Sequence, residues 1–331
     1  MQIYLYKLKF QGPTHFGDTG IDLENVSERV SSDTLFSAFV NSIRTTEGLD
    51  TVNDFINTFI ENPPFFISSL FLYHGDKFFL PRPLSDKDIS KEVRKELGKD
   101  LKKLSWLTPQ SFFKWITGSD FNGSEIKSMR EEQDNNYDRS FKVEIRPRVS
   151  LDRTTRNSNI YHCSYIYFEE NAGLYGMVAF SDIHSIDFFK QTIQVLGEIG
   201  LGGEKAYGAG MFKLAEFRPI ESPFSEIFSV PSSSQHVLLS LYHPSTQELS
   251  MIQTNLLAYG LLRKKGWVAS GRYALPIKRK SVGFFAEGSV FSSHLRGRLV
   301  DVTPDGDYRN LLEHKVYRYG YAFMAPMIGG Q

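Results

Sequence analysis

The residues best suited to recognition chemistry lie in a short glycine-rich segment near position 205. Glycine backbone can adopt positive φ and leaves N–H groups open to a phosphate, while a lysine adds charge and a tyrosine offers a ring for stacking. The segment lacks the ending of a Walker loop and the strand-to-helix context of a dinucleotide fingerprint. It therefore indicates a site for an RNA backbone, or else a helix cap and tight turn that need glycine for geometry alone. Its members are Gly200, Gly202, Gly203, Lys205, Tyr207, Gly208 and Gly210.

A second candidate is a group of arginines in the middle of the chain. Arginines at alternating or nearly alternating positions of an extended segment share a face and can reach successive phosphates. The acidic neighbours Glu144 and Asp152 weaken the positive field. A solvated surface charge run is the simpler alternative. The arginines are Arg146, Arg148, Arg153 and Arg156.

Two further features suggest chemistry less directly. Residues 102–118 interleave lysines with Trp106, Phe112 and Trp115. Such a mixture can stack bases, but we favour an amphipathic helix that packs its aromatic side chains inward. His15 follows the first predicted strand and could serve as general base on a ribose 2′-OH. Because no second acid–base partner can be assigned to it, we favour a structural or RNA-binding role.

The rest of the sequence narrows the classes of function. The other histidines have no metal-ligand spacing, and no Gly-x-Ser-x-Gly nucleophile elbow occurs. We therefore expect no cofactor, no metal and no covalent catalysis. Lys+Arg and Asp+Glu number 38 each, so any nucleic-acid site must be local.

The cellular setting is also predicted from composition. The single cysteine, Cys163, excludes an intramolecular disulfide and multi-cysteine zinc sites, which fits a reducing cytoplasm. The first ten residues alternate like a strand and do not form a signal peptide. No apolar run is long enough to cross a bilayer. We expect a soluble cytoplasmic protein without membrane contact.

The elements that must position these residues follow an α+β order. Periodicity predicts a strand at 2–10, a helix at 31–48, a hairpin around residues 74–76, a second hairpin from 164–171 and 174–181, a helix at 184–200 and a strand at 211–217. Residues 85–160 are dense in charge and predict a projecting insertion. Without it, the order is the β-α-β-β-α-β of a ferredoxin-like domain.

A stretch rich in serine and proline, residues 221–234, predicts a domain boundary. We therefore divide the chain into residues 1–220, with the insertion at about 85–160 and the glycine-rich loop at 200–210, and residues 234–331. The second part is predicted to contain strands and one helical stretch at 246–262. It could be a degenerate copy of the first part, giving two ferredoxin-like (RRM-like) domains.

Several segments carry a resemblance to a known family. FQGPTHFGD follows the first strand, PRVSLDRTT lies in the middle, LGGEKAYGAGMF forms the glycine-rich loop, and GRLVDVTP and VYRYGYAFMAP stand near the C-terminus. In this order, the sequence resembles the RAMP superfamily of CRISPR proteins, and most closely the fourth-subunit family of the type III-A (Csm) effector complex.

The resemblance implies two ferredoxin-like domains, the first with a thumb in the insertion. It implies a non-enzymatic subunit that holds the 5′ tag of the crRNA, contacts the large signature subunit and a backbone subunit, and lies near the target RNA. It also implies RNA contacts at the glycine-rich loop with Lys205. A metal-independent RNA-processing endoribonuclease that uses His15 is the alternative.

Overall fold

The fold is mixed α+β with antiparallel sheets, as the sequence predicts. The computed structural model of the chain describes residues 1–17, 23–85, 91–118, 121–152, 154–155, 157–231, 234–268, 277–306, 312 and 314–329. Its largest sheet has the order β10-β1-β9-β3-β4, and β2 also pairs with β9. These strands are β1 (Gln2–Phe10), β2 (Phe65–Ile67), β3 (Phe71–His74), β4 (Lys77–Phe78), β9 (Ala172–Phe180) and β10 (Phe212–Pro219).

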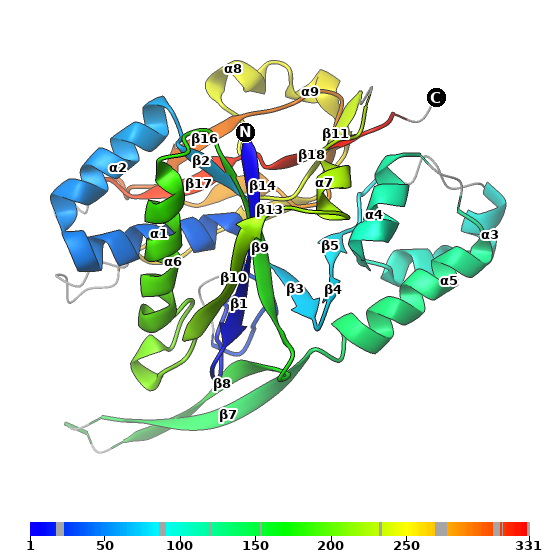
Figure 1. Ribbon diagram of the computed structural model, residues 1–331. Coiled ribbons are helices and arrows are strands. Elements are labelled where there is room, and N and C mark those ends of the chain that lie inside the picture. The colour runs from blue at the N-terminus through cyan, green and yellow to red at the C-terminus, as the bar shows by residue number, and fades with distance from the viewer. Residues whose placement is uncertain are drawn as a thin grey trace.

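Both faces of this sheet are buried, because successive side chains of a strand point to opposite faces. On β1, Tyr6 and Leu8 join the core beneath three helices, whereas Leu5 joins the core on the other face. Figure 1 shows the three helices on one side of the sheet and the helical part of the insertion on the other. The helices are α1 (Ser32–Glu47), α2 (Leu49–Glu61) and α6 (Ser185–Ile199), and all three were predicted, α2 as a short helical stretch at 51–62.

The first part of the insertion is a packed helical body. Phe112, Trp115 and Ile126 are fully buried in the same apolar cluster as Leu5 and Tyr175 of the sheet. This confirms the amphipathic interpretation of the aromatic residues near 112. The elements are β5 (Leu80–Pro81), α3 (Lys91–Lys103), β6 (Trp106–Leu107), α4 (Pro109–Ile116), α5 (Gly123–Glu132) and the π-helix η1 (Gln133–Tyr137).

The second part of the insertion is a long hairpin that extends away from the body (Figure 1). It consists of β7 (Phe141–Leu151) and β8 (Ser158–Phe168), paired from Phe141↔Phe168 to Leu151↔Ser158. The predicted hairpin between residues 164–171 and 174–181 is therefore wrong. β8 pairs with β7, while β9 enters the large sheet between β1 and β3. Both runs alternate, and alternation alone does not name a strand's partner.

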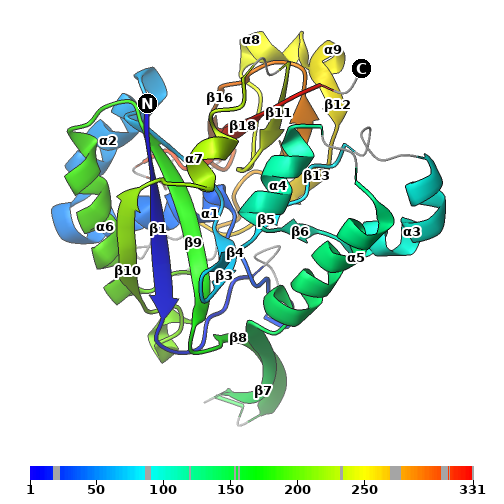
Figure 2. The same cartoon turned by 45° about the vertical axis from the view of Figure 1, so that its right-hand side comes forward.

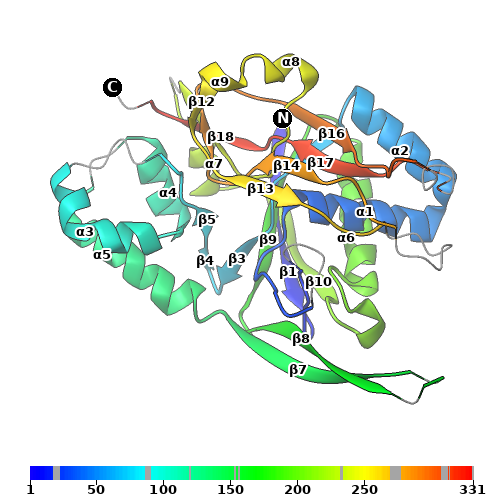
Figure 3. The same cartoon turned by 180° about the vertical axis from the view of Figure 1, so that it is seen from behind.

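The second half contains shorter strands than the first. β11, β12, β15 and β18 form one sheet, and two further pairs are β13 with β14 and β16 with β17. Figures 2 and 3 show these strands stacked above one end of the large sheet. The strands are β11 (Gln235–Leu238), β12 (Leu256–Ala258), β13 (Leu261–Lys264), β14 (Val282–Phe285), β15 (Val290–Phe291), β16 (Gly297–Asp301), β17 (Tyr317–Tyr321) and β18 (Met324–Met327).

The helical stretch predicted at 246–262 is only partly helical. It holds two single turns, α8 (Thr246–Leu249) and α9 (Ile252–Asn255), followed by β12 and β13. Glu248 closes a capping box with Ser245, and its carboxylate also accepts hydrogen bonds from Arg296 N and Gly297 N. Tertiary contacts thus outweigh helix propensity here.

The predicted boundary segment is not an open linker. It contains the short helix α7 (Phe224–Ile227), and Phe224, Ile227 and Val230 are buried in a cluster that also holds Val237 and Phe323. Apolar residues of both halves therefore share one core. The division into residues 1–220 and 234–331 stays a prediction.

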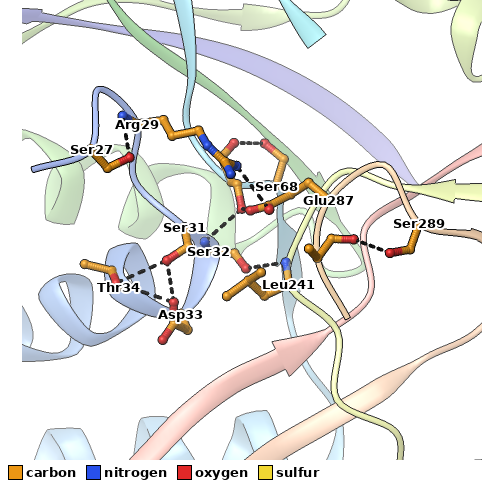
Figure 4. A network of polar contacts seen from close by, with 12 residues as sticks. Ser27, Arg29, Ser31, Ser32, Asp33, Thr34, Ser68, Leu241, Glu287 and Ser289 are labelled. Atoms are coloured by element: carbon orange, nitrogen blue, oxygen red, sulfur yellow. Dashed lines mark hydrogen bonds and ion pairs between the residues drawn. The ribbon is translucent and has the colours of Figure 1, made fainter. Parts of the chain in front are cut away.

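Buried charges also link the two halves. Asp33, at the start of α1, pairs with Arg318 on β17, and both side chains are at most 5% exposed. Glu287, between β14 and β15, accepts from Arg29 at 3.1 Å and from the Ser69 hydroxyl. Figure 4 shows the network around Glu287 and the start of α1. Each half therefore supplies a carboxylate that the other half neutralises.

Arg318→Met tests this link. The change leaves Asp33 buried with its nearest cation removed, so we expect the free energy of unfolding at pH 7 to fall by about 3–5 kcal/mol in urea titrations. The control is Lys280→Met, which breaks an exposed pair with Asp305 and should cost less than about 1 kcal/mol. Equal losses in the two variants would contradict the account.

The same measurement has a defined pH dependence. Burial alone would raise the pKa of Asp33, but Arg318, Lys264 and the Ser31 hydroxyl outweigh it and lower the pKa. The folded pKa thus lies below the unfolded value of about 3.9. The stabilisation is complete above that value and is lost as the pH falls through the folded pKa. As the pH falls below about 4 and through the folded pKa, the difference in stability between wild type and Arg318→Met should therefore shrink.

Candidate RNA interface

The glycine-rich loop connects α6 to β10 and rests on the segment that follows β1. Gly203 N donates to His15 O at 2.8 Å, and Gly210 N donates to Pro13 O at 2.8 Å. Within the loop, Leu201 N donates to Gly210 O at 2.9 Å. These hydrogen bonds hold the loop in one conformation, so its exposed part is presented by a fixed base.

Glycine is required where this contact is closest. At Gly202, φ is +99°, and a Cβ would lie 2.5 Å from His15 O and 2.8 Å from the Phe16 ring. At Gly210, φ is +81°, and a Cβ would lie 2.0 Å from Leu201 O. The geometric explanation of the glycines therefore holds at these two positions. It does not exclude recognition by the residues between them.

Those residues form a single 3₁₀ turn, η2 (Lys205–Tyr207), which lies at the surface. The Tyr207 side chain is 68% exposed. Lys205 is exposed and forms no ion pair with the residues that the structure describes. Partial desolvation lowers the pKa of Lys205. An anion next to this ammonium would offset that cost.

The structure brings the glycine-rich loop and the arginine segment together at one side chain. Arg148, on β7, forms an ion pair with Glu204 at 2.7 Å, and its guanidinium lies 3.9 Å from the centre of the Tyr207 ring. It also donates to the Tyr165 hydroxyl. Arg148 and Glu204 are each less than 20% exposed. Arg148 thus joins the hairpin to the loop.

Arg146 continues the same face of the hairpin. Its guanidinium lies 5.5 Å from the ring centres of both Tyr165 and Tyr167 on β8, and it pairs with Glu144 at 2.9 Å. The prediction that Arg146 and Arg148 share a face is confirmed, since both contact Tyr165. Tyr165 is buried beneath these guanidinium groups, so the rings that reach the surface beside the cations are Tyr207 and the partly exposed Tyr167.

Sequence analysis missed the tyrosines of β8 and the role of Glu204. Tyr161, Tyr165 and Tyr167 stand at odd positions of an alternating run, which was a usable signal for a shared face. Burial raises the pKa of Tyr165, so its phenol stays neutral and can accept from Arg148. Glu204 has φ +57°, a conformation that no sequence pattern indicates.

The remaining predicted residues are placed differently. Arg153 and Arg156 lie outside the described residues. Just before them, the Asp152 carboxylate accepts from Thr154 N at 2.8 Å and from the Thr155 hydroxyl at 2.7 Å. Asp152 therefore shapes the hairpin tip and is already occupied by local hydrogen bonds.

His15 is a buried residue with local partners. Its side chain is 4% exposed, and Nδ1 lies 2.9 Å from Ser164 O. Gly203 packs over the ring, because a Cβ there would lie 2.8 Å from His15 Cδ2. Cys163, the single cysteine, is also fully buried beside it. His15 thus supports the glycine-rich loop from below.

Two further features are absent from the described residues. They contain no cluster of three or more His, Cys, Asp or Glu side chains that could hold a metal ion. Among the same residues, no helix has the length and apolar character needed to cross a bilayer.

The fold and this surface point to a class of protein. The model of the RAMP superfamily matches residues 7–213, which include the hairpin and the glycine-rich loop. A second model, described as the CRISPR Csm4 C-terminal domain, matches residues 231–327. The chain belongs to the Csm4 family of the RAMP superfamily, which confirms the resemblance seen in the sequence.

Individual relatives agree with this assignment. A protein of Thermococcus onnurineus named CRISPR system Cms protein Csm4 is 30% identical over 303 residues, covering 88% of this chain and 89% of the relative. One of Mycobacterium tuberculosis (strain CDC 1551 / Oshkosh) with the same name is 25% identical and covers 96% of both chains.

Solved structures support the fold. One is a Csm1-Csm4 cassette in complex with cA4, with a TM-score of 0.64, 23% identity and full coverage of both chains. Another is a Csm3-Csm4 subcomplex of the type III-A CRISPR-Cas interference complex, with a TM-score of 0.63, 18% identity and coverage of 99% and 100%.

Gly202→Ala tests whether the loop needs its close contact with residue 15. We expect the free energy of unfolding to fall by about 1–3 kcal/mol because of the strained φ and the collision. Hydrogen exchange at the Gly203 amide, which donates to His15 O, should accelerate. The control is Gly12→Ala, where a Cβ meets no atom within 4 Å. Unchanged exchange at Gly203 would contradict the proposed support.

Proposed function

We propose that this chain is a non-catalytic RNA-binding subunit of a type III-A CRISPR (Csm) complex that holds the 5′ tag of the crRNA. The observation that carries the proposal is the Arg148 contact, which unites the glycine-rich loop and the hairpin into one aromatic and cationic surface. Membership of the Csm4 family supports the type of complex.

The surface suits single-stranded RNA. Exposed Tyr207 and the partly exposed Tyr161 and Tyr167 of β8 offer rings on which bases can stack, a contact worth about 1–3 kcal/mol per base. Arg146, Arg148 and Lys205 can approach phosphates, and of these Lys205 has no anionic partner among the described residues. Glu144 and Glu204 limit the positive charge, so shape and stacking contribute alongside charge.

The proposal of a non-catalytic role is supported by the position of His15. A general base must reach the proton it removes, whereas this imidazole is buried between Ser164 O and Gly203. In our proposal, His15 positions the RNA-binding loop. The endoribonuclease alternative gains no support from any contact of His15.

We also propose two protein partners. Relatives of the same fold were solved as a Csm1-Csm4 cassette and as a Csm3-Csm4 subcomplex. By analogy, we infer that this chain binds the large signature subunit and a backbone subunit, with the target RNA nearby.

Neutralising the three cations Arg146, Arg148 and Lys205 with glutamine tests the RNA site. We expect the affinity for RNA that carries the tag of the organism's own repeat to fall about tenfold or more in filter binding. The slope of log K against log salt should become shallower by about 2, since roughly 0.7 is lost per phosphate contact on a single strand. The control replaces Lys95, Lys99 and Lys102 of α3, an equal loss of charge. Equal affinities for the two variants would contradict the site.

His15→Ala separates the two functions. We expect no specific cleavage of repeat RNA in EDTA by either the wild type or the variant, because the imidazole is buried. Denaturing gels of the incubated RNA provide the measurement. Cleavage by the wild type that disappears in the variant would establish the endoribonuclease instead.

A further inference from the structure

A separate cavity of about 520 Å³ lies between α1, α2 and the segment leading into β17. Figure 3 shows these two helices beside β17 and β14. The cavity shares no lining residue with the glycine-rich loop or the hairpin. Arg44 comes from α1, Arg279 precedes β14, and Lys315 precedes β17, so cations from three segments meet there.

The described residues that line this cavity carry positive charge without acidic side chains to balance it. None of its described lining residues is an aspartate or glutamate. Arg44, Arg279 and Lys315 form no ion pair with the described residues. In a chain with equal numbers of acidic and basic residues, three such cations at one cavity favour an anionic ligand.

Arg279 shows the imbalance most clearly. Its Nε donates to Trp267 O at 2.7 Å, but Asp33, the carboxylate whose charge acts on it, is already paired with Arg318. Burial, together with repulsion from Arg318, lowers the pKa of Arg279 to about 10. An anion in the cavity would supply the missing counter-charge. His314, another lining residue, has a buried Nε2 without a hydrogen-bond partner.

The other walls offer contacts for a planar, partly apolar group. Val40 and Ile56 form part of an apolar wall, and Asn53 and Asn57 lie one turn apart on the exposed face of α2. A carboxamide carries both donors and an acceptor, which is what the edge of a nucleobase requires. The cavity is large enough for a ligand of nucleotide size.

We propose that this cavity binds one nucleotide, with its phosphate between Arg44, Arg279 and Lys315 and its base against the α2 wall. The nucleotide can be free or part of an RNA strand, because the recognised chemistry is the same. The proposal goes beyond the tag-binding function and does not depend on it.

Calorimetric titration of the full-length protein with AMP, adenosine and inorganic phosphate tests the site. We expect AMP to bind more tightly than either fragment. Arg44→Gln combined with Lys315→Gln should weaken AMP binding about tenfold or more, since two charge-assisted hydrogen bonds are lost. Lys315 is exposed and Arg44 is half-buried, and neither forms an ion pair with the described residues, so the variant should fold. Lys95→Gln combined with Lys102→Gln is the charge-matched control and should leave AMP binding unchanged.

A second arm identifies the source of the nucleotide. In a Lys205→Gln background, a 5′-phosphorylated tetraadenylate replaces AMP. The cavity holds a nucleotide of an RNA strand if two results are found together. The tetraadenylate binds whereas AMP does not, and the Arg44 and Lys315 changes weaken the binding of the tetraadenylate. The proposal is overturned if these changes affect neither AMP nor the tetranucleotide, or if adenosine or phosphate binds as tightly as AMP. If the Lys205 change alone abolishes binding of the tag RNA, that result concerns the tag-binding function and does not test the cavity.

Discussion

The structure depends on an exchange of buried charge between its two halves. Asp33 in the first half is neutralised by Arg318 of the second, and Glu287 in the second half by Arg29 of the first. A buried carboxylate without its partner is strongly unfavourable, so neither half can move away from the other at low cost. This fixes the start of α1 and the strands around β17 as one body. The cavity beside α1 and α2 is held in shape by the same ion pairs, because its walls come from α1 and from the segment that leads into β17.

The candidate RNA surface is built on the same body, but its charged side chains are paired less completely than those of the core. In the core each acid has a cation, whereas the glycine-rich loop leaves Lys205 without an ion pair among the described residues and places Arg148 between two tyrosine rings. The contact of the loop with Pro13 and His15 gives this surface a rigid support. A chain without net charge can thus carry a local site, because charges of one sign can gather at one place on its surface.

Much of the fold could be predicted from the sequence. The features that could not be predicted depend on contacts between segments that are distant in the chain. β1, α1, α6 and β10 follow from periodicity, since each buries a regular face. The pairing of β8 with β7 could not be predicted, because its alternation fits several partners. In the site, the glycine-rich loop and the pair Arg146 and Arg148 were predicted as separate candidates. The contact of Arg148 with Glu204 and Tyr207 was not predicted, because it depends on where the β7–β8 hairpin lies relative to the loop. The burial of His15 depends on Gly203, which is distant in sequence.

Mapping the contact between protein and guide RNA tests the central claim most directly. Tag-containing crRNA, bound to the full-length protein, would be crosslinked with ultraviolet light and the attached peptides identified by mass spectrometry. The account predicts that the tag nucleotides attach to Tyr207 and to the partly exposed Tyr161 and Tyr167 of β8. Attachment of the tag confined to α3, α4 or α5, with none at the glycine-rich loop or the hairpin, would contradict it.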